Sequence, residues 1–198
     1  MKTVIESAQR CTGSLKKGYT DGAVEDGAVD ETNRLKESIY ETAQELVEIA
    51  KKHRVTIGAA ESCSGGAVAS AITSVPGCSD VFKGAVVSYA NEAKTALLDV
   101  DEALLASAGA VDGGVALQMA RGALRALKVD FALSTTGIAG PDGGSEHKPV
   151  GTVWIAVAGN ATEQVTLYHF AGTREHIRQA TAKKALQKLT DFIQGAFG

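Results

Sequence analysis

The stretch that decides the fold is VTIGAAESCSGGAVASAITSV, residues 55–75. It opens with a short apolar run, Val55 to Ala60, which we interpret as a buried strand. Ser62 to Gly66 is a polar turn with two glycines. Ala67 to Val75 continues as a helix, which Pro76-Gly77 ends. A buried strand that leads directly into a helix is typical of layered α/β domains.

The same alternation extends along the chain in both directions. Upstream, apolar side chains at helical spacing predict an amphipathic helix over residues 30–53. Downstream, strands are predicted at residues 84–89, 131–136, 150–158 and 163–170, and helices at residues 91–98, 101–106, 116–127 and after Thr173. The last two strands are typical of a hairpin. The pattern therefore predicts an α/β fold of three layers, α/β/α, around a mixed, mostly parallel central sheet.

The length of 198 residues suits one domain, or one domain with a tail. Residues 1–30 contain four scattered glycines and no sustained apolar period, so we expect a mobile N-terminal extension. The alternative is a strand or helix docked on a neighbouring subunit. Residues 31–198 are predicted to form a single domain, and 44% hydrophobic residues are enough for a packed core.

Charge and cysteine content exclude several classes of protein. A net charge of −3 gives no basic excess for a phosphate backbone, which argues against nucleic acid as a partner. No apolar run is long enough to span a membrane, and the first residues lack the apolar stretch of a signal peptide. Three cysteines without a CxxC pair fit a reducing compartment without structural zinc. We expect a cytoplasmic protein that needs no metal and no cofactor.

Three loops follow predicted strands, at the edge of the sheet where open α/β folds bind their ligands. They span residues 61–66, 89–94 and 136–144. The third is too polar and too rich in glycine for a core, so it is either a ligand-binding loop or an ordinary surface loop. The candidate substrate-binding residues in the three loops are Glu61, Ser64, Gly65, Gly66, Asn91, Thr136, Gly137, Gly140 and Gly143.

Ser62 is the candidate nucleophile of the first loop. Ser64 is placed to cap the following helix, and Gly65-Gly66 allow backbone N–H groups to approach an anion or a developing oxyanion. A capped turn without any chemistry explains the same residues, and the spacing alone does not distinguish the two. The segment matches neither a Walker A loop nor a G-x-S-x-G elbow.

Lys94 is the candidate base of the second loop. Asn91 is predicted to cap a helix there, which puts Lys94 in its first turn, where the helix dipole disfavours a cation and lowers the pKa of a lysine. A neutral lysine beside a serine hydroxyl can act as a general base. The alternative is a solvated surface lysine, which is the usual fate of that residue type.

Weaker candidates were weighed against this pair. The four histidines are scattered and have no metal-ligand spacing. Ser14-Leu15-Lys16-Lys17 matches Ser-x-x-Lys but lies in the predicted extension, so we interpret it as a false positive. Cys63 ranks below Ser62 as a nucleophile because no histidine accompanies it, and it is interpreted as a small buried residue.

From about residue 35 to 195 the sequence resembles the CinA C-terminal domain family, whose stand-alone members are nicotinamide-nucleotide amidohydrolases. Four motifs in order carry the resemblance, residues 60–66 (AESCSGG), 88–94 (SYANEAK), 136–144 (TGIAGPDGG) and 148–154 (KPVGTVW). Two departures stand out. Ser64 replaces a usual threonine, and Asp112-Gly113 replace a usual Ser-Glu. We expect Asp112 still to cap the helix that follows.

The resemblance implies hydrolysis of nicotinamide mononucleotide, a small-molecule nucleotide substrate, to nicotinate mononucleotide and ammonia. It puts the family's serine nucleophile on Ser62, its lysine on Lys94 and a motif tyrosine on Tyr89, all as catalytic residues, with oxyanion donors near Ser64, Gly65 and Gly66. It also favours a homo-oligomer. The alternatives are a nucleotide-binding module without turnover, and an amidase for a different small amide.

Overall fold

The structure is a computed structural model that describes residues 26–159 and 161–198, with side chains from residue 33 onward and without that of residue 160. Its helices are α1 (Asp26–His53), α2 (Ala67–Thr73), α3 (Asn91–Leu98), α4 (Glu102–Ala108), α5 (Gly113–Leu127) and α6 (Arg174–Phe197), with a short 3-10 helix, η1 (Cys78–Asp80). Its strands are β1 (Ile57–Glu61), β2 (Phe82–Val87), β3 (Phe131–Gly137), β4 (Thr152–Gly159) and β5 (Glu163–His169).

Every predicted strand and helix is present, and most boundaries move by three residues or fewer. The largest difference is at the start of α1, which begins at Asp26 rather than near Asp30. Residues 26–30, which the prediction placed in the extension, are therefore part of α1. Its remaining residues, 1–25, which include the Ser14–Lys17 motif, lie outside the described residues.

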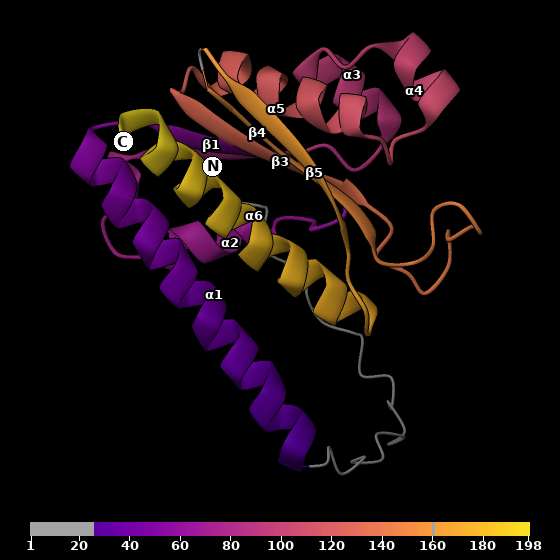
Figure 1. The fold of residues 1–198 in the computed structure, drawn as a ribbon, viewed down its shortest axis with the longest axis horizontal. Coiled ribbons are helices and arrows are strands. Elements are labelled where there is room, and N and C mark those ends of the chain that lie inside the picture. Colours follow the sequence, from indigo (N-terminus) through magenta and orange to yellow (C-terminus); the bar gives the residue numbers. More distant parts are fainter. Residues whose placement is uncertain (1–25, 160) are drawn as a thin grey trace, which may run out of the picture.

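Helices cover both faces of a single sheet, which confirms the three-layer prediction. In Figure 1, α1, α2 and α6 lie on one face, and α3, α4 and α5 lie on the other. The first face buries Leu46, Ile72 and Leu186. The second buries Leu98 and Met119, among others. None of the described helices is both long enough and apolar enough to cross a bilayer.

The sheet has the order β2-β1-β3-β4-β5. The pairs β1–β2 and β1–β3 are parallel, and β4 pairs antiparallel with both β3 and β5. Within the described residues, β4 is therefore the one strand that runs against the other four. The mixed, mostly parallel sheet is confirmed, and the predicted hairpin is β4–β5.

The register brings the ends of three strands to one edge of the sheet. Glu61, the last residue of β1, lies beside Val87 of β2 and Thr135 of β3. The loops that follow these strands must therefore emerge side by side, although they are far apart in the sequence. This is the edge at which an open α/β sheet binds ligands.

A glycine sets the position of α3 on the sheet. A Cβ at Gly122 of α5 would lie 2.2 Å from the backbone oxygen of Leu98, the last residue of α3. Only a residue without a side chain allows the two helix backbones to approach this closely. Because Leu98 also packs into the core, α3 is held rigidly, and Lys94 one turn earlier is directed inward.

Candidate active site

A cavity of about 260 Å³ lies beyond the carboxyl ends of β1 and β3. Seven predicted site residues line it: Ser62, Tyr89, Lys94, Thr136, Gly137, Gly140 and Gly143. Five others are not among its lining residues: Glu61, Ser64, Gly65, Gly66 and Asn91. The three loops thus come together at this cavity. For the five residues that do not line it, direct contact with a ligand stays a prediction.

Ser62 is held in the tight turn between β1 and α2. Its N–H group donates to the carbonyl of Thr135 on β3 (2.9 Å), and its own carbonyl accepts from Gly65 N–H (3.1 Å). The side chain is 8% exposed, and the residue lines the cavity. The hydroxyl is therefore fixed by backbone on both sides, and ligands in the cavity can still reach it.

Glu61, rather than Ser64, caps α2. Its fully buried carboxylate accepts the N–H groups of Gly66 (2.9 Å), Val68 (3.1 Å) and Ala69 (2.9 Å), and the Ser64 hydroxyl (2.8 Å). A carboxylate suits this position because the free N–H groups and the dipole of a helix start both favour negative charge. The predicted serine cap is wrong, since Ser64 donates to the group that forms the cap.

We expect Glu61→Gln to destabilise the protein by about 1–3 kcal/mol, because an amide offers one acceptor oxygen and no charge to these four donors. Denaturant unfolding monitored by circular dichroism measures the change. Glu92→Gln is the matched control, since Glu92 lies exposed in the first turn of α3. Equal stability losses in the two variants would contradict the capping role of Glu61.

The structure also changes which N–H groups are free to bind an oxyanion. Gly65 N–H is engaged with Ser62, and Gly66 N–H is engaged with Glu61. The N–H groups of Cys63 and Ser64 contact only the Cys63 thiol, which is a weak acceptor. Of these two residues, Cys63 lines the cavity and Ser64 does not, so the Cys63 N–H group, rather than those of the glycines, is the candidate oxyanion donor beside Ser62.

Lys94 is fully buried, and its side-chain amino group faces Ser62. Nζ lies 3.1 Å from Ser62 Oγ and donates to the carbonyls of Ser88 (2.8 Å) and Tyr89 (3.2 Å). Burial lowers the pKa of Lys94 below its ordinary value, because an apolar environment disfavours the charged form. A neutral amine has two N–H donors and one lone pair. The two carbonyls take the donors, which leaves the lone pair for the Ser62 proton.

Cys63 lies next to Ser62 but is unsuited to nucleophilic attack. The residue is 6% exposed, and burial raises the pKa of its thiol to about 12. The thiolate is the reactive form of cysteine, so a thiol that stays protonated at neutral pH is a poor nucleophile. This agrees with its interpretation as a small buried residue.

Tyr89 and Asn91 are both exposed, but of the two it is Tyr89 that lines the cavity. The Tyr89 side chain is 62% exposed, and its hydroxyl accepts a hydrogen bond from Arg174 (3.0 Å) at the mouth of the cavity. Asn91 is the first residue of α3 and is exposed, while Ala90 is the N-cap and makes no side-chain cap. The predicted Asn91 cap is wrong, because an amide inside the helix cannot reach back to its first N–H groups.

The opposite wall of the cavity combines the glycine-rich loop with the segment before α5. The Thr136 hydroxyl donates to the carbonyl of Ala110 (2.7 Å), so it anchors that segment. Gly140 and Gly143 have φ angles of +76° and +87°, which favour glycine because a Cβ would clash with the backbone. At these two glycines the loop brings its backbone to the cavity.

The departure from the family motif at Asp112-Gly113 is accommodated locally. Asp112 caps α5 as expected, accepting the N–H groups of Gly114 (2.7 Å) and Val115 (3.4 Å). Gly113 packs against the indole of Trp154, and an added Cβ would lie 3.1 Å from that ring. A larger residue at this position would have to displace the ring.

Arg174 is a cavity residue that the sequence reasoning missed. It opens α6, and its guanidinium donates to the Gly140 carbonyl (2.6 Å) as well as to Tyr89. Arg174 and Lys94 are the two basic residues among the described residues that line this cavity. The signal was available, because a cation in the first turn of a helix opposes the dipole, the same argument that selected Lys94.

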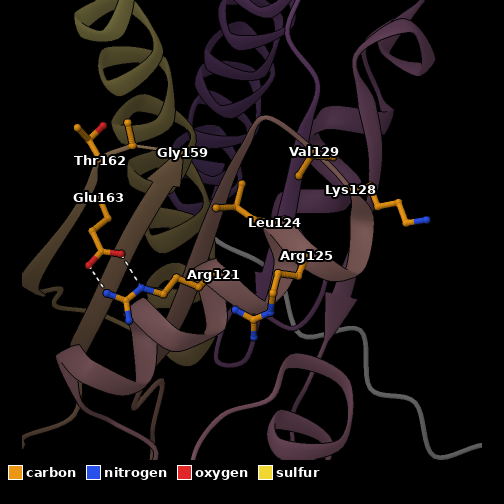
Figure 2. Close-up of a pocket in the computed structure, with 9 residues that line it drawn as sticks. Arg121, Leu124, Arg125, Lys128, Val129, Gly159, Thr162 and Glu163 are labelled. Carbon is orange, nitrogen blue, oxygen red and sulfur yellow. Dashed lines mark hydrogen bonds and ion pairs between the residues drawn. The ribbon is translucent and has the colours of Figure 1, made fainter.

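A larger cavity of about 670 Å³ lies at the far end of α5, but its basic side chains do not converge. Arg121 is paired with Glu163, and Arg125 donates to Asp99 (3.2 Å). Figure 2 shows Lys128 pointing away from both arginines. Among the described residues, no three His, Cys, Asp or Glu side chains gather as a metal site. The Ser62–Lys94 cavity is therefore the better candidate site.

Comparison with known proteins identifies the family of the chain. Residues 39–193 match the family model described as the CinA C-terminal domain. This chain belongs to the CinA C-terminal domain family. Its match to the family includes β1, the Ser62 turn, α3 and the glycine-rich loop, so all three site loops of this CinA C-terminal domain lie inside the matched region.

Individual relatives fall into two kinds. The nicotinamide-nucleotide amidohydrolase PncC of Escherichia coli K12 is 44% identical over 158 residues, which cover 79% of this chain and 96% of the relative. A CinA-like protein of Geobacter metallireducens is 43% identical over 191 residues, 94% of this chain but 46% of the relative. The CinA C-terminal domain described here thus spans about half the length of the second relative.

A solved structure has the same fold. The competence/damage inducible protein CihA from Agrobacterium tumefaciens superposes with a TM-score of 0.77 at 37% identity, covering 79% of this chain and 96% of that protein. The α/β architecture of the CinA C-terminal domain is therefore shared with a protein of known structure.

Proposed function

We propose that this protein is an amidohydrolase that converts nicotinamide mononucleotide to nicotinate mononucleotide and ammonia. The observation that carries the proposal is the fully buried Lys94, whose Nζ lies 3.1 Å from Ser62 Oγ at the wall of a cavity. The similarity to a relative named nicotinamide-nucleotide amidohydrolase supports the choice of substrate.

In the first step, neutral Lys94 removes the hydroxyl proton of Ser62 as Oγ attacks the carboxamide carbon. The contact of 3.1 Å between Nζ and Oγ is short enough for direct proton transfer. The carbonyl oxygen becomes an oxyanion, to which the Cys63 N–H group can donate, since Cys63 lines the cavity beside Ser62. The backbone bonds that hold Ser62 keep this donor fixed before the substrate arrives.

In the second step, the tetrahedral intermediate breaks its C–N bond. The Lys94 ammonium returns the proton to the departing nitrogen, ammonia leaves, and a nicotinoyl ester remains on Ser62 Oγ.

In the third step, neutral Lys94 takes a proton from a water molecule that attacks the ester carbon. The C–O bond breaks, the proton returns to Ser62, and nicotinate mononucleotide is released. Tyr89 contributes its backbone carbonyl, which holds Lys94, and its hydroxyl, which contacts Arg174.

Arg174 supplies the positive charge that a phosphate needs. A guanidinium binds phosphate through charge-assisted hydrogen bonds, and this one lies beside the N-terminus of the 24-residue helix α6, which also favours an anion. The cavity volume of about 260 Å³ lies just below the range of about 300–1,000 Å³ that is usual for small-molecule sites, so the cavity fits only a small ligand. The glycine-rich loop between Arg174 and the nucleophile is proposed to hold the ribose.

We expect Arg174→Met to raise the KM for the mononucleotide by about 10- to 100-fold, because a charge-assisted hydrogen bond contributes about 1.5–3 kcal/mol. The KM for nicotinamide riboside, which has no phosphate, should change little. Steady-state ammonia release with both substrates measures the effect, and Arg125→Met at the far end of α5 is the control. An equal rise for both substrates would show that Arg174 acts only by anchoring Gly140.

The wild-type protein decides between this proposal and its rivals. Ammonia release is compared for nicotinamide, its riboside and its mononucleotide at equal concentrations, and binding is measured in parallel. Binding of the mononucleotide without ammonia release would favour a nucleotide-binding module. Equal turnover of all three compounds would favour a different amidase. So would ammonia release from another small amide but from none of these three. A buried lysine against a serine supports turnover, because binding alone requires neither the low pKa nor the contact.

A further inference from the structure

Lys148 ties the glycine-rich loop to the segment that precedes α5. It lies on the returning limb of the loop and is partly buried. Its Nζ donates to the carbonyls of Ala108 (2.9 Å) and Val111 (2.8 Å). Lys148 is not among the residues that line the candidate site, and the proposed chemistry does not use it.

The acceptors explain why a cation is needed at this position. Ala108 is the last residue of α4, where helix carbonyls lack partners and the dipole is negative. Val111 contributes a second carbonyl from the connection between α4 and α5. An ammonium that donates to both makes two charge-assisted hydrogen bonds, which are stronger and better directed than neutral ones. The side chain therefore fixes the distance between the loop and this connection.

These two segments form a wall of the substrate cavity. Ala110 and Val111 line it from the connection, and Gly140 and Gly143 line it from the loop. Arg174 holds the outgoing limb of the loop through the Gly140 carbonyl. Lys148 is the side chain that holds the returning limb to the body of the protein.

The contacts of Lys148 also fix the tip of the glycine-rich loop. Ser145 N–H donates to the Lys148 carbonyl (2.9 Å), and Lys148 N–H donates to the Ser145 hydroxyl (3.1 Å). This reciprocal pair closes a small turn, so that fixing Lys148 also fixes Ser145. Without the lysine, this turn would lose its side-chain contact with the α4–α5 connection and would be held through backbone bonds near Pro149, such as that from Thr152 N–H to the Pro149 carbonyl (3.0 Å).

We propose that Lys148 is a positioning residue, which sets the width of the substrate cavity by holding the glycine-rich loop against the α4–α5 connection. The inference rests on the proposed amidohydrolase function for its kinetic consequence. Lys148 acts on substrate affinity and not on bond breaking, because it donates to the cavity wall at Val111 and does not itself line the cavity, unlike Ser62 and Lys94.

The kinetic test replaces the ammonium by an apolar chain of similar length. We expect Lys148→Met to raise KM about tenfold for the mononucleotide and for the riboside alike, with kcat within about threefold of wild type, because the wall is displaced and the reacting groups are not. Lys148→Arg keeps N–H donors and should restore part of the loss. Lys188→Met is the matched control, since Lys188 joins α6 to β5 through Gln164, away from the cavity.

A second measurement does not depend on catalysis. In Lys148→Met, amide hydrogen exchange should become faster in both residues 138–151 and 108–112, and should stay unchanged in α1 and α6. If the wild type releases no ammonia, the proposed function fails, while this exchange pattern still tests the role of Lys148.

Three results would overturn the proposal. A KM rise for the mononucleotide alone would mean that Lys148 binds the phosphate directly. Unchanged KM and unchanged exchange in both segments would mean that the contact is dispensable. A loss of kcat in a folded Lys148→Arg protein as large as in Lys148→Met would mean that the lysine takes part in the chemistry.

Discussion

Ser62→Ala is expected to reduce ammonia release from nicotinamide mononucleotide by about 10⁴-fold or more, the scale on which hydrolases lose rate when their nucleophile is removed. The loss is large because the alanine methyl group cannot form the acyl intermediate, and the buried Cys63 thiol beside it stays protonated and cannot substitute. Binding of the mononucleotide should remain, because the cavity walls are unchanged. Steady-state ammonia release and calorimetric binding measure the two properties.

Ser70→Ala serves as the control, since Ser70 lies exposed on α2 and does not line the cavity. Mass spectrometry of the wild type, quenched during turnover, should detect a nicotinoyl ester on the peptide that contains Ser62. Near-normal turnover of Ser62→Ala would exclude the serine as nucleophile. It would leave direct attack by water as the remaining mechanism for the same cavity.

Lys94→Met is expected to lower kcat by about 10²–10⁴-fold, the usual contribution of a positioned general base. Lys94→Arg should be equally inactive, because a guanidinium stays protonated and has no lone pair to accept the Ser62 proton. Together the two variants separate loss of the base from loss of the positive charge. Retention of turnover in Lys94→Arg would contradict the role of a neutral lysine.

The pH profile gives an independent measure of the same base. Because burial lowers the Lys94 pKa, the fraction of neutral lysine at pH 7 is larger than for an exposed lysine with a pKa of about 10.4. The value of kcat/KM should rise with pH through this lowered pKa and then level off. The residual activity of Lys94→Met should lack this rise of kcat/KM with pH. If the rise persists in that variant, it does not report the titration of Lys94.

The stability of Lys94→Met should change in a direction opposite to its activity. A lysine with a lowered native pKa binds fewer protons when folded than when unfolded, between the native pKa and about 10.4. The lowered pKa of Lys94 therefore makes the free energy of unfolding rise with pH in that window. At lower pH the buried lysine destabilises the folded protein. Lys94→Met removes this penalty, so its Tm at pH 7 should equal or exceed that of the wild type.

Local sequence patterns were sufficient for the secondary structure and the layers. The apolar run Val55–Ala60, the glycine turn after it and the helical periodicity beyond Ala67 depend on neighbours within a few residues, so they can be recognised without the fold. The same holds for the Thr173 cap of α6, whose hydroxyl accepts the His176 N–H (3.2 Å). A prediction of parallel strands also predicts that the loops after these strands lie together at one edge of the sheet.

The partners of polar side chains were less predictable. Ser64 and Asn91 were both assigned as caps, because their residue types favour helix starts. In the structure the buried carboxylate of Glu61 caps α2, and α3 has no side-chain cap. Cap preferences describe what a residue can reach locally. Glu61 prevails because the last residue of a buried strand points its side chain back over the start of α2.

The sequence by itself determined a strand–turn–helix that carries Ser62, a lysine at the start of another helix, and a glycine-rich loop between strands, since each depends on local geometry. Only the tertiary structure decided that Lys94 is buried, that its Nζ lies 3.1 Å from Ser62 Oγ, and that the side chains of Arg174 and Lys148 make the contacts Arg174–Gly140 and Lys148–Ala108. Burial and contact between distant residues depend on how α3 and α6 pack on the sheet. No local pattern contains that information, because packing is settled by all layers of the core together.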